Sequence, residues 1–147
     1  DSGADFTIFR TAWLYGEHGR CFPKVIAGLL ESRDEISVVG DQIGSPTWTR
    51  DLAGVIVDHG LNNYGETLVH AVSSSQGSWF DFATEIQNAM SALEGKVIRS
   101  ISTEEYPTPA KRPAWSVLDN SETKGLVIGD WRERWKVAAP IVLKDFI

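Results

Sequence analysis

The chain has too few cysteines, too little positive charge and too short apolar runs to belong to several broad classes of protein. Its one cysteine, Cys21, cannot form an internal disulfide, so a reducing, cytoplasmic setting is expected. The 14 Lys and Arg against 20 Asp and Glu give a formal net charge of −6, which argues against nucleic acid and anionic membrane surfaces as partners. The longest apolar run, 137–143, is far shorter than the roughly 18 residues of a membrane-spanning helix.

Motifs that carry catalysis or cofactor binding by themselves are also missing. The sequence has no Gly-x-Ser-x-Gly, no His-Glu-x-x-His, no phosphate loop and no Cys/His set with zinc spacing. It also lacks Gly-x-Gly-x-x-Gly, the loop that presents a helix N-terminus to a dinucleotide pyrophosphate. Gly16 and Gly19 come nearest, and we interpret them as part of a turn. We expect neither a metal nor a nicotinamide cofactor to be bound by this chain alone.

The pattern of the chain is that of one α/β domain. A length of 147 residues and 42% hydrophobic residues suffice for a well-formed core, about 70% of the unfolded surface being buried in a chain of this size. Strands and helices alternate. Strands are predicted over 6–15, 36–39, 67–72 and 97–101, with a brief extended piece at 117–118; helices are predicted over 22–33, 49–60 and 78–95, and from Asp130 onward. The chain begins with Asp1 and enters a strand almost at once, so we expect a piece of a longer protein.

Several residues predict how these elements begin and end. Thr49 is expected to cap the second helix, and Ser78 with Asp81 forms an acidic variant of the capping box for the third. The segment 102–113 contains three prolines and is predicted to be a loop. Pro140 is expected to break or kink the last helix.

The first candidate for binding is a tryptophan. Six tryptophans are many for a chain of this length, and Trp13 lies where the first predicted strand leads into a loop. Ligands of open α/β sheets gather at the carboxyl ends of strands, where an indole face can stack on a sugar ring. Ordinary packing in the core remains the alternative for this side chain.

Two polar segments are further candidates. Lys111 and Arg112, in a loop stiffened by prolines, could bind a diphosphate, with Arg112 able to do so bidentately; a solvated charge pair is the alternative. Segment 41–47, followed by Arg50, offers amides, hydroxyls and a guanidinium, although it also fits a turn before a helix. Cys21 and His59 are interpreted as core residues.

The order of these segments resembles the C-terminal half of the dTDP-4-dehydrorhamnose reductases, a family of extended short-chain dehydrogenases/reductases. The motifs that carry the resemblance are Arg-Thr-Ala-Trp-Leu-Tyr-Gly at 10–16, Asp-Gln-Ile-Gly-Ser-Pro-Thr at 41–47, Asp-Leu-Ala at 51–53, Ser-Trp-Phe-Asp-Phe-Ala at 78–83, Tyr-Pro-Thr-Pro-Ala-Lys-Arg-Pro at 106–113 and Ser-Val-Leu-Asp at 116–119. The resemblance covers essentially the whole chain.

The resemblance implies a reaction and a set of binding residues. Such enzymes use NADPH or NADH to reduce the 4-keto group of dTDP-4-dehydro-6-deoxy-L-mannose (dTDP-4-dehydrorhamnose) to dTDP-L-rhamnose, and a Tyr-x-x-x-Lys pair acts on the keto oxygen. Carried over to this chain, Trp13 would contact the deoxysugar. Arg112 and Arg50 would contact phosphate, by analogy with related nucleotide-sugar enzymes.

The sequence departs from the family pattern because the catalytic motif is missing. No Tyr is followed by Lys four residues later; Tyr106, for example, is followed by Ala110. Residues 1–147 are therefore expected to be the substrate-binding C-terminal domain with the last strands and helices of a Rossmann-like sheet, inactive without the missing N-terminal half. Exposed sheet surface predicts a homo-oligomer or another partner chain. A non-catalytic nucleotide-sugar-binding or interaction module on the same fold remains the alternative.

Overall fold

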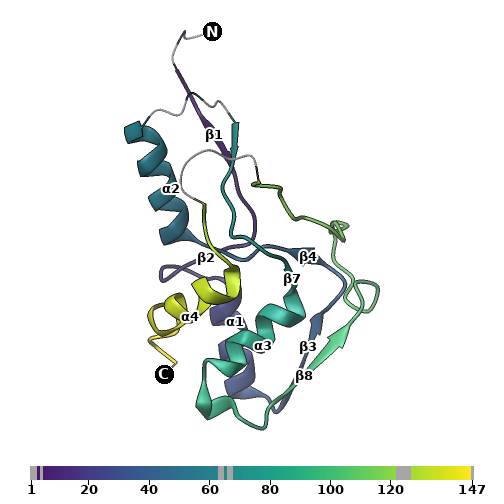
Figure 1. Ribbon diagram of the computed structural model, residues 1–147. Helices are drawn as coiled ribbons and strands as arrows, with labels where there is room; N and C mark the ends of the chain where they lie inside the picture. Colours follow the sequence, from purple (N-terminus) through teal and green to yellow (C-terminus); the bar gives the residue numbers. More distant parts are fainter. Residues whose placement is uncertain (1–2, 4, 63–64, 66–67, 122–126, 147) are drawn as a thin grey trace.

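The computed structural model describes residues 3, 5–62, 65, 68–121 and 127–146, and these residues alternate between strands and helices (Figure 1). The elements are β1 (Ile8–Arg10), β2 (Leu14–Tyr15), α1 (Phe22–Ser32), β3 (Glu35–Val39), β4 (Ile43–Gly44), β5 (Thr47–Trp48), α2 (Thr49–Asn62), β6 (Leu68–His70), β7 (Gly77–Ser78), α3 (Trp79–Asn88), the 3₁₀ helix η1 (Ser91–Leu93), β8 (Val97–Ile101) and α4 (Trp131–Val142). The predicted α/β class is confirmed.

The strands pair into short two-stranded sheets. β1 pairs with β6, β2 with β5 and β3 with β8 in parallel, whereas β4 and β7 are antiparallel. Each parallel pair is connected through at least one helix, because parallel strands need a crossover. In Figure 1, α2 lies beside β1 at one end of the molecule, and α1, α3, β3 and β8 lie toward the other.

The prediction of one strand over 6–15 is wrong, because the segment forms two strands in different sheets. β1 ends at Arg10 and β2 begins at Leu14. Between them, Trp13 has a φ of 48°, in the left-handed region that bulky residues rarely adopt. The β-branched and aromatic residues of the segment favour extended structure, but their composition does not reveal this turn.

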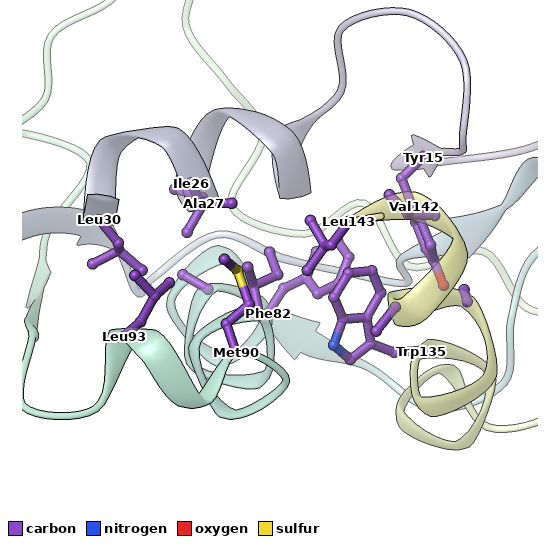
Figure 2. Packing of buried hydrophobic residues seen from close by; sticks show 14 of the residues in the cluster. Tyr15, Ile26, Ala27, Leu30, Phe82, Met90, Leu93, Trp135, Val142 and Leu143 are labelled. Carbon is purple, nitrogen blue, oxygen red and sulfur yellow. The ribbon is translucent and has the colours of Figure 1, made fainter. Parts of the chain in front are cut away.

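The main core lies between α1, α3 and α4, and Phe82 is at its centre (Figure 2). Ring centroids between 5.3 and 5.6 Å from that of Phe82 belong to Tyr15, Phe22, Trp131 and Trp135. Two of these contacts, with Trp131 and Trp135, are edge-to-face, a geometry that aromatic pairs favour. Burying a side chain such as Phe82 contributes about 1.5–3 kcal/mol, so this cluster fixes how the three helices pack.

A smaller core joins α2 to β1. Val55 is buried there and Phe9 packs against the cluster, with its ring centroid 5.3 Å from that of His59 in an edge-to-face contact. The His59 Nε2 atom lies 3.3 Å from the hydroxyl of Thr7. His59 is buried and hydrogen-bonded, so the interpretation of this residue as a core histidine is confirmed.

The capping box of α3 is confirmed. The Ser78 hydroxyl accepts a hydrogen bond from the backbone N–H of Asp81 at 3.0 Å. The Asp81 carboxylate in return accepts from the backbone N–H of Ser78 at 2.7 Å. Two N–H groups that the helix cannot satisfy are thereby paired, and the direction in which α3 leaves β7 is fixed.

Other predicted helix ends differ from the structure. Thr49 is the first residue of α2 rather than its cap, and α2 continues beyond Gly60. α3 ends at Asn88, not at Gly95, because η1 follows it. The apolar spacing persists through η1, since Leu93 is buried there, and for this reason the sequence pattern resembles one longer helix.

Near the C-terminus, the expected break of the last helix at Pro140 is wrong, and the extended piece expected at 117–118 is not part of a strand. Pro140 does not break α4, which continues to Val142. Pro140 is exposed in the last turn, where its missing N–H removes one helical hydrogen bond while Ala139 and Val142 stay buried. Val117 and Leu118 form no strand; the bridge in this region joins Trp115 to Ile43.

Apolar side chains are exposed along β1, β6 and α2. Phe6 is 65% exposed, and Ile8 and Leu68, which are register partners, are 52% and 46% exposed. Val57 and Leu61 on α2 are exposed as well. Single exposed apolar residues are common, but here they form a group on neighbouring elements.

Replacing Ser78 by Ala should destabilise the protein by about 1 kcal/mol, because the substitution removes the side-chain half of the capping box. Urea unfolding would measure the difference, and the melting temperature should fall by about 3 °C. Ser91→Ala, at an exposed serine that is the first residue of η1 and not its N-cap, is the matched control and should have little effect. Equal stability of Ser78→Ala and the unchanged protein would contradict this role of the cap.

Candidate functional site

A cavity of about 610 Å³ lies between α1, β3 and the loop that follows β8. One wall is apolar and comes mainly from α1 and β3; the other carries an indole pair and polar groups. The lining residues are Trp13, Phe22, Val25, Ile26, Leu29, Ser37, Val38, Val39, Gln42, Trp79, Tyr106, Thr108, Arg112, Pro113 and Ser116. This combination of an apolar body and a few polar groups is typical of small-molecule sites.

Segment 102–116 contains the loop predicted over 102–113. Hydrogen bonds to Asp41 and to β4 hold the segment near its two ends. The Asp41 carboxylate accepts hydrogen bonds from the backbone N–H and the hydroxyl of Thr103, the latter at 2.7 Å. At the other end, the Ile43 N–H donates to the Ala114 carbonyl at 2.8 Å, and the Ser116 N–H donates to the Ile43 carbonyl at 2.8 Å. The central part of the loop is exposed and carries Arg112 over the cavity.

Trp13 lines this cavity, as expected of a ligand-contacting residue, but its indole is also tightly packed. Its ring is stacked on that of Trp79, with centroids 3.5 Å apart and planes inclined by 6°. Its Nε1–H donates to the Ser116 hydroxyl at 3.1 Å. A Cβ placed on Gly44 would come within 2.3–2.6 Å of three atoms of the Trp13 ring, so only glycine fits at this position.

Arg112 lines the same cavity as Trp13, whereas the neighbouring Lys111 is not among the lining residues. In the part of the chain that the structure describes, Arg112 makes no ion pair with a carboxylate. A guanidinium in this state retains all its donors for a ligand, and its planar geometry suits a phosphate.

Arg50 is separated from these two residues. It lines another pocket, of about 370 Å³, together with residues 14–18, 20, 21 and 49. Its guanidinium donates to the Glu17 carboxylate at 2.8 Å. The pKa of the Glu17 carboxylate is lowered from 4.5 to about 2. The causes are a hydrogen bond from the backbone N–H of Glu17 itself, followed by those from the Arg50 guanidinium and the Trp48 indole. Phosphate binding by Arg50 stays a prediction, and Arg50 does not share the cavity.

Sequence reasoning missed several cavity residues. Trp79 was assigned only to the start of a helix, although its position beside the Ser78 cap places it near the end of β7. Gln42 and Ser116 lie inside motifs that carried the family resemblance, which was the available signal for them. Cys21, interpreted as a buried core residue, is only half-buried, and its Sγ donates to the Gly16 carbonyl at 3.5 Å.

The described residues contain no cluster of three or more His, Cys, Asp or Glu that could hold a metal ion. No helix in the same part of the chain has both the length and the apolar character needed to cross a membrane.

Comparison with known proteins identifies the family. A family model described as the RmlD substrate binding domain matches residues 1–146. This chain belongs to that family. It is similar to the spore coat polysaccharide biosynthesis protein SpsK of Bacillus subtilis, with 41% identity over 131 residues, which are 88% of this chain and 45% of SpsK.

Solved structures of relatives share the fold. A dTDP-4-dehydrorhamnose reductase of Clostridium acetobutylicum matches with a TM-score of 0.83 and 39% identity, over 92% of this chain and 48% of that protein. One from Bacillus anthracis, solved in complex with NADP, matches with a TM-score of 0.80 and 34% identity, over 92% and 48%. The fold is therefore that of the substrate-binding domain of an extended Rossmann-like reductase, as predicted. The chain spans about half the length of the relatives it matches.

The depressed pKa of Glu17 predicts a pH dependence of stability in this RmlD-family chain. Because the folded pKa lies below the unfolded one, the stabilisation is complete above about pH 4.5 and is lost as the pH falls toward 2. Glu17→Gln should reduce stability at pH 7 by about 1 kcal/mol or less, because the arginine of the pair is 57% exposed, and the difference should shrink toward pH 2. Melting temperatures across this range would measure it.

Arg50→Ala serves as the comparison for Glu17→Gln. It removes the second-largest cause of the shift and leaves the backbone hydrogen bond, so the acid-dependent loss should become smaller without disappearing. A stability difference between Glu17→Gln and the unchanged protein that stayed constant from pH 7 to pH 2 would contradict the prediction.

Proposed function

We propose that this chain is the substrate-binding part of an NAD(P)H-dependent reductase that converts dTDP-4-dehydrorhamnose to dTDP-L-rhamnose. One observation carries the proposal: Trp13, the sugar contact expected from the family resemblance, and Arg112, the phosphate contact expected by analogy with related nucleotide-sugar enzymes, line a single cavity of about 610 Å³. Their segments are about 100 residues apart in the sequence, and both are hydrogen-bonded to segment 43–47: β4 to the residues after Arg112, and β5 to the Trp13 carbonyl. Relatives named dTDP-4-dehydrorhamnose reductase support the same substrate.

The cavity has suitable chemistry for both ends of a nucleotide-linked deoxysugar. Arg112 would bind the diphosphate through charge-assisted hydrogen bonds. The indole of Trp13 would contact the hexose, while the apolar wall from α1 and β3 would accept the less polar faces of the ligand. Binding on two sides in this way would orient the keto carbon, which is the contribution of this domain to the reaction rate.

The dinucleotide would be held outside this chain. α1 begins after Cys21 without a side-chain cap and without a glycine-rich turn, so it does not offer the phosphate cradle of a Rossmann fold. NADPH, bound by the other half of the protein, would supply the hydride; a complex of one relative with NADP supports this choice of cofactor.

The partner of this domain would be the N-terminal half of the same protein, bearing the cofactor site and the Tyr-x-x-x-Lys pair. The exposed apolar side chains of β1, β6 and α2, among them Phe6, Ile8 and Leu68, form the surface that this half would cover. Relatives about twice as long as this chain support the arrangement.

Arg112→Ala in the full-length protein should weaken binding of dTDP-L-rhamnose by about tenfold to a hundredfold, because a charge-assisted hydrogen bond contributes about 1.5–3 kcal/mol. Titration calorimetry would measure the affinity. Lys111→Ala, in the same loop but outside the cavity, is the matched control and should change the affinity by less than about threefold. Equal losses for the two variants would indicate general charge attraction and would remove Arg112 from the site.

The 147-residue chain alone should self-associate, because its apolar strands remain uncovered. Light scattering would detect this, and adding the N-terminal half should restore a monodisperse complex that binds dTDP-L-rhamnose. A clean monomer at high concentration would contradict the uncovered surface. Micromolar binding of dTDP-L-rhamnose by the chain alone would favour the alternative of a self-sufficient, non-catalytic binding module.

A further inference from the structure

Both faces of the half-buried Trp13 indole have close neighbours, which restricts the stacking of a sugar on either face. Trp79 covers one face with a nearly parallel ring at 3.5 Å. Gly44 covers the other: a Cβ there would be 2.3 Å from Cε2 and 2.6 Å from both Cζ2 and Nε1, distances that place it above the ring rather than beside it. Trp13 therefore presents an edge to the cavity.

Hydrogen bonds further restrict the side chain and the backbone of Trp13. The only polar atom of the indole, Nε1, donates to the Ser116 hydroxyl, which itself donates to the Ile43 carbonyl at 3.0 Å. Its backbone has a φ of 48°, and its carbonyl accepts from the Thr47 N–H at 3.2 Å. A bulky residue keeps such a strained backbone only where its surroundings determine it, and strain of this kind is concentrated at functional sites.

We propose that Trp79 is a positioning residue for the sugar subsite: its stack holds the Trp13 indole against Gly44, so that the hexose meets the edge of Trp13 rather than its face. The inference rests on the proposed function and refines it. Trp79 is suited to this role because it is the first residue of α3, where the capping box of Ser78 and Asp81 fixes the backbone. Phe22, with its centroid 4.5 Å away, supports the Trp79 ring in turn.

Affinities for two ligands test the proposal in the full-length protein: dTDP-L-rhamnose, and dTDP, which lacks the sugar. Trp79→Ala should lower the affinity for dTDP-L-rhamnose about tenfold and leave the affinity for dTDP unchanged. The reason is that the Trp13 indole would no longer be held in position, and only the sugar contacts it. Trp79→Phe keeps a stacking ring and should restore most of the affinity. Val137→Ala removes an apolar side chain that is 50% exposed on α4 and outside the cavity, and should change neither affinity.

A double-mutant cycle separates positioning from direct contact. If Trp79 acts through Trp13, then Trp79→Ala should have little further effect once Trp13→Ala is present. Additive losses would mean that each indole contacts the sugar independently, and would overturn the positioning role.

Gly44→Ala provides a second route that leaves both indoles in place. The new methyl group would displace the Trp13 ring from the opposite side, so selective loss of dTDP-L-rhamnose affinity is again expected. If Gly44→Ala and Trp79→Ala both melt normally and keep the preference for dTDP-L-rhamnose over dTDP, the inference is wrong although the proposed function stands. If the unchanged protein binds neither ligand, the proposed function fails and the inference fails with it.

Discussion

A continuous series of packed aromatic rings connects the cavity to the main core. Trp13 stacks on Trp79, Trp79 contacts Phe22 at 4.5 Å, and Phe22 contacts Phe82 at 5.6 Å between centroids. Phe82 then contacts Trp135 at 5.3 Å in the centre of the core (Figure 2). Because packed interiors transmit displacements rather than absorb them, the position of the cavity wall is set by the same contacts that hold α1, α3 and α4 together.

The cavity depends equally on a very short strand. β4 has two residues, yet it pairs with β7 on one side and with the segment at Trp115 on the other. The first contact places the start of α3, and therefore Trp79; the second places the loop of Arg112. The residues of the cavity lie in segments far apart in the sequence, so this small sheet determines their spacing more than any single helix does.

How far the sequence predicts this molecule can be seen in particular residues. The capping box at Ser78 and the helix over 22–33 were predictable because both follow from local spacing, and the pair Trp13 and Arg112 emerged because family motifs relate distant segments. The turn at Trp13 was not predictable, since its backbone is held by tertiary contacts with Gly44, Trp79 and Ser116 that local propensity does not contain. The early stop of α3 was hidden because η1 keeps Leu93 on the buried side.

Gly44 and Trp13 occupy what is in effect one shared volume. The backbone of β4 approaches the indole so closely that no atom can be added at position 44 while the ring keeps its place. Bulk can therefore be redistributed between the two positions but not increased at both. A relative with a larger residue where this chain has Gly44 would need a smaller side chain opposite it, and the contour that it offers to a hexose would change accordingly.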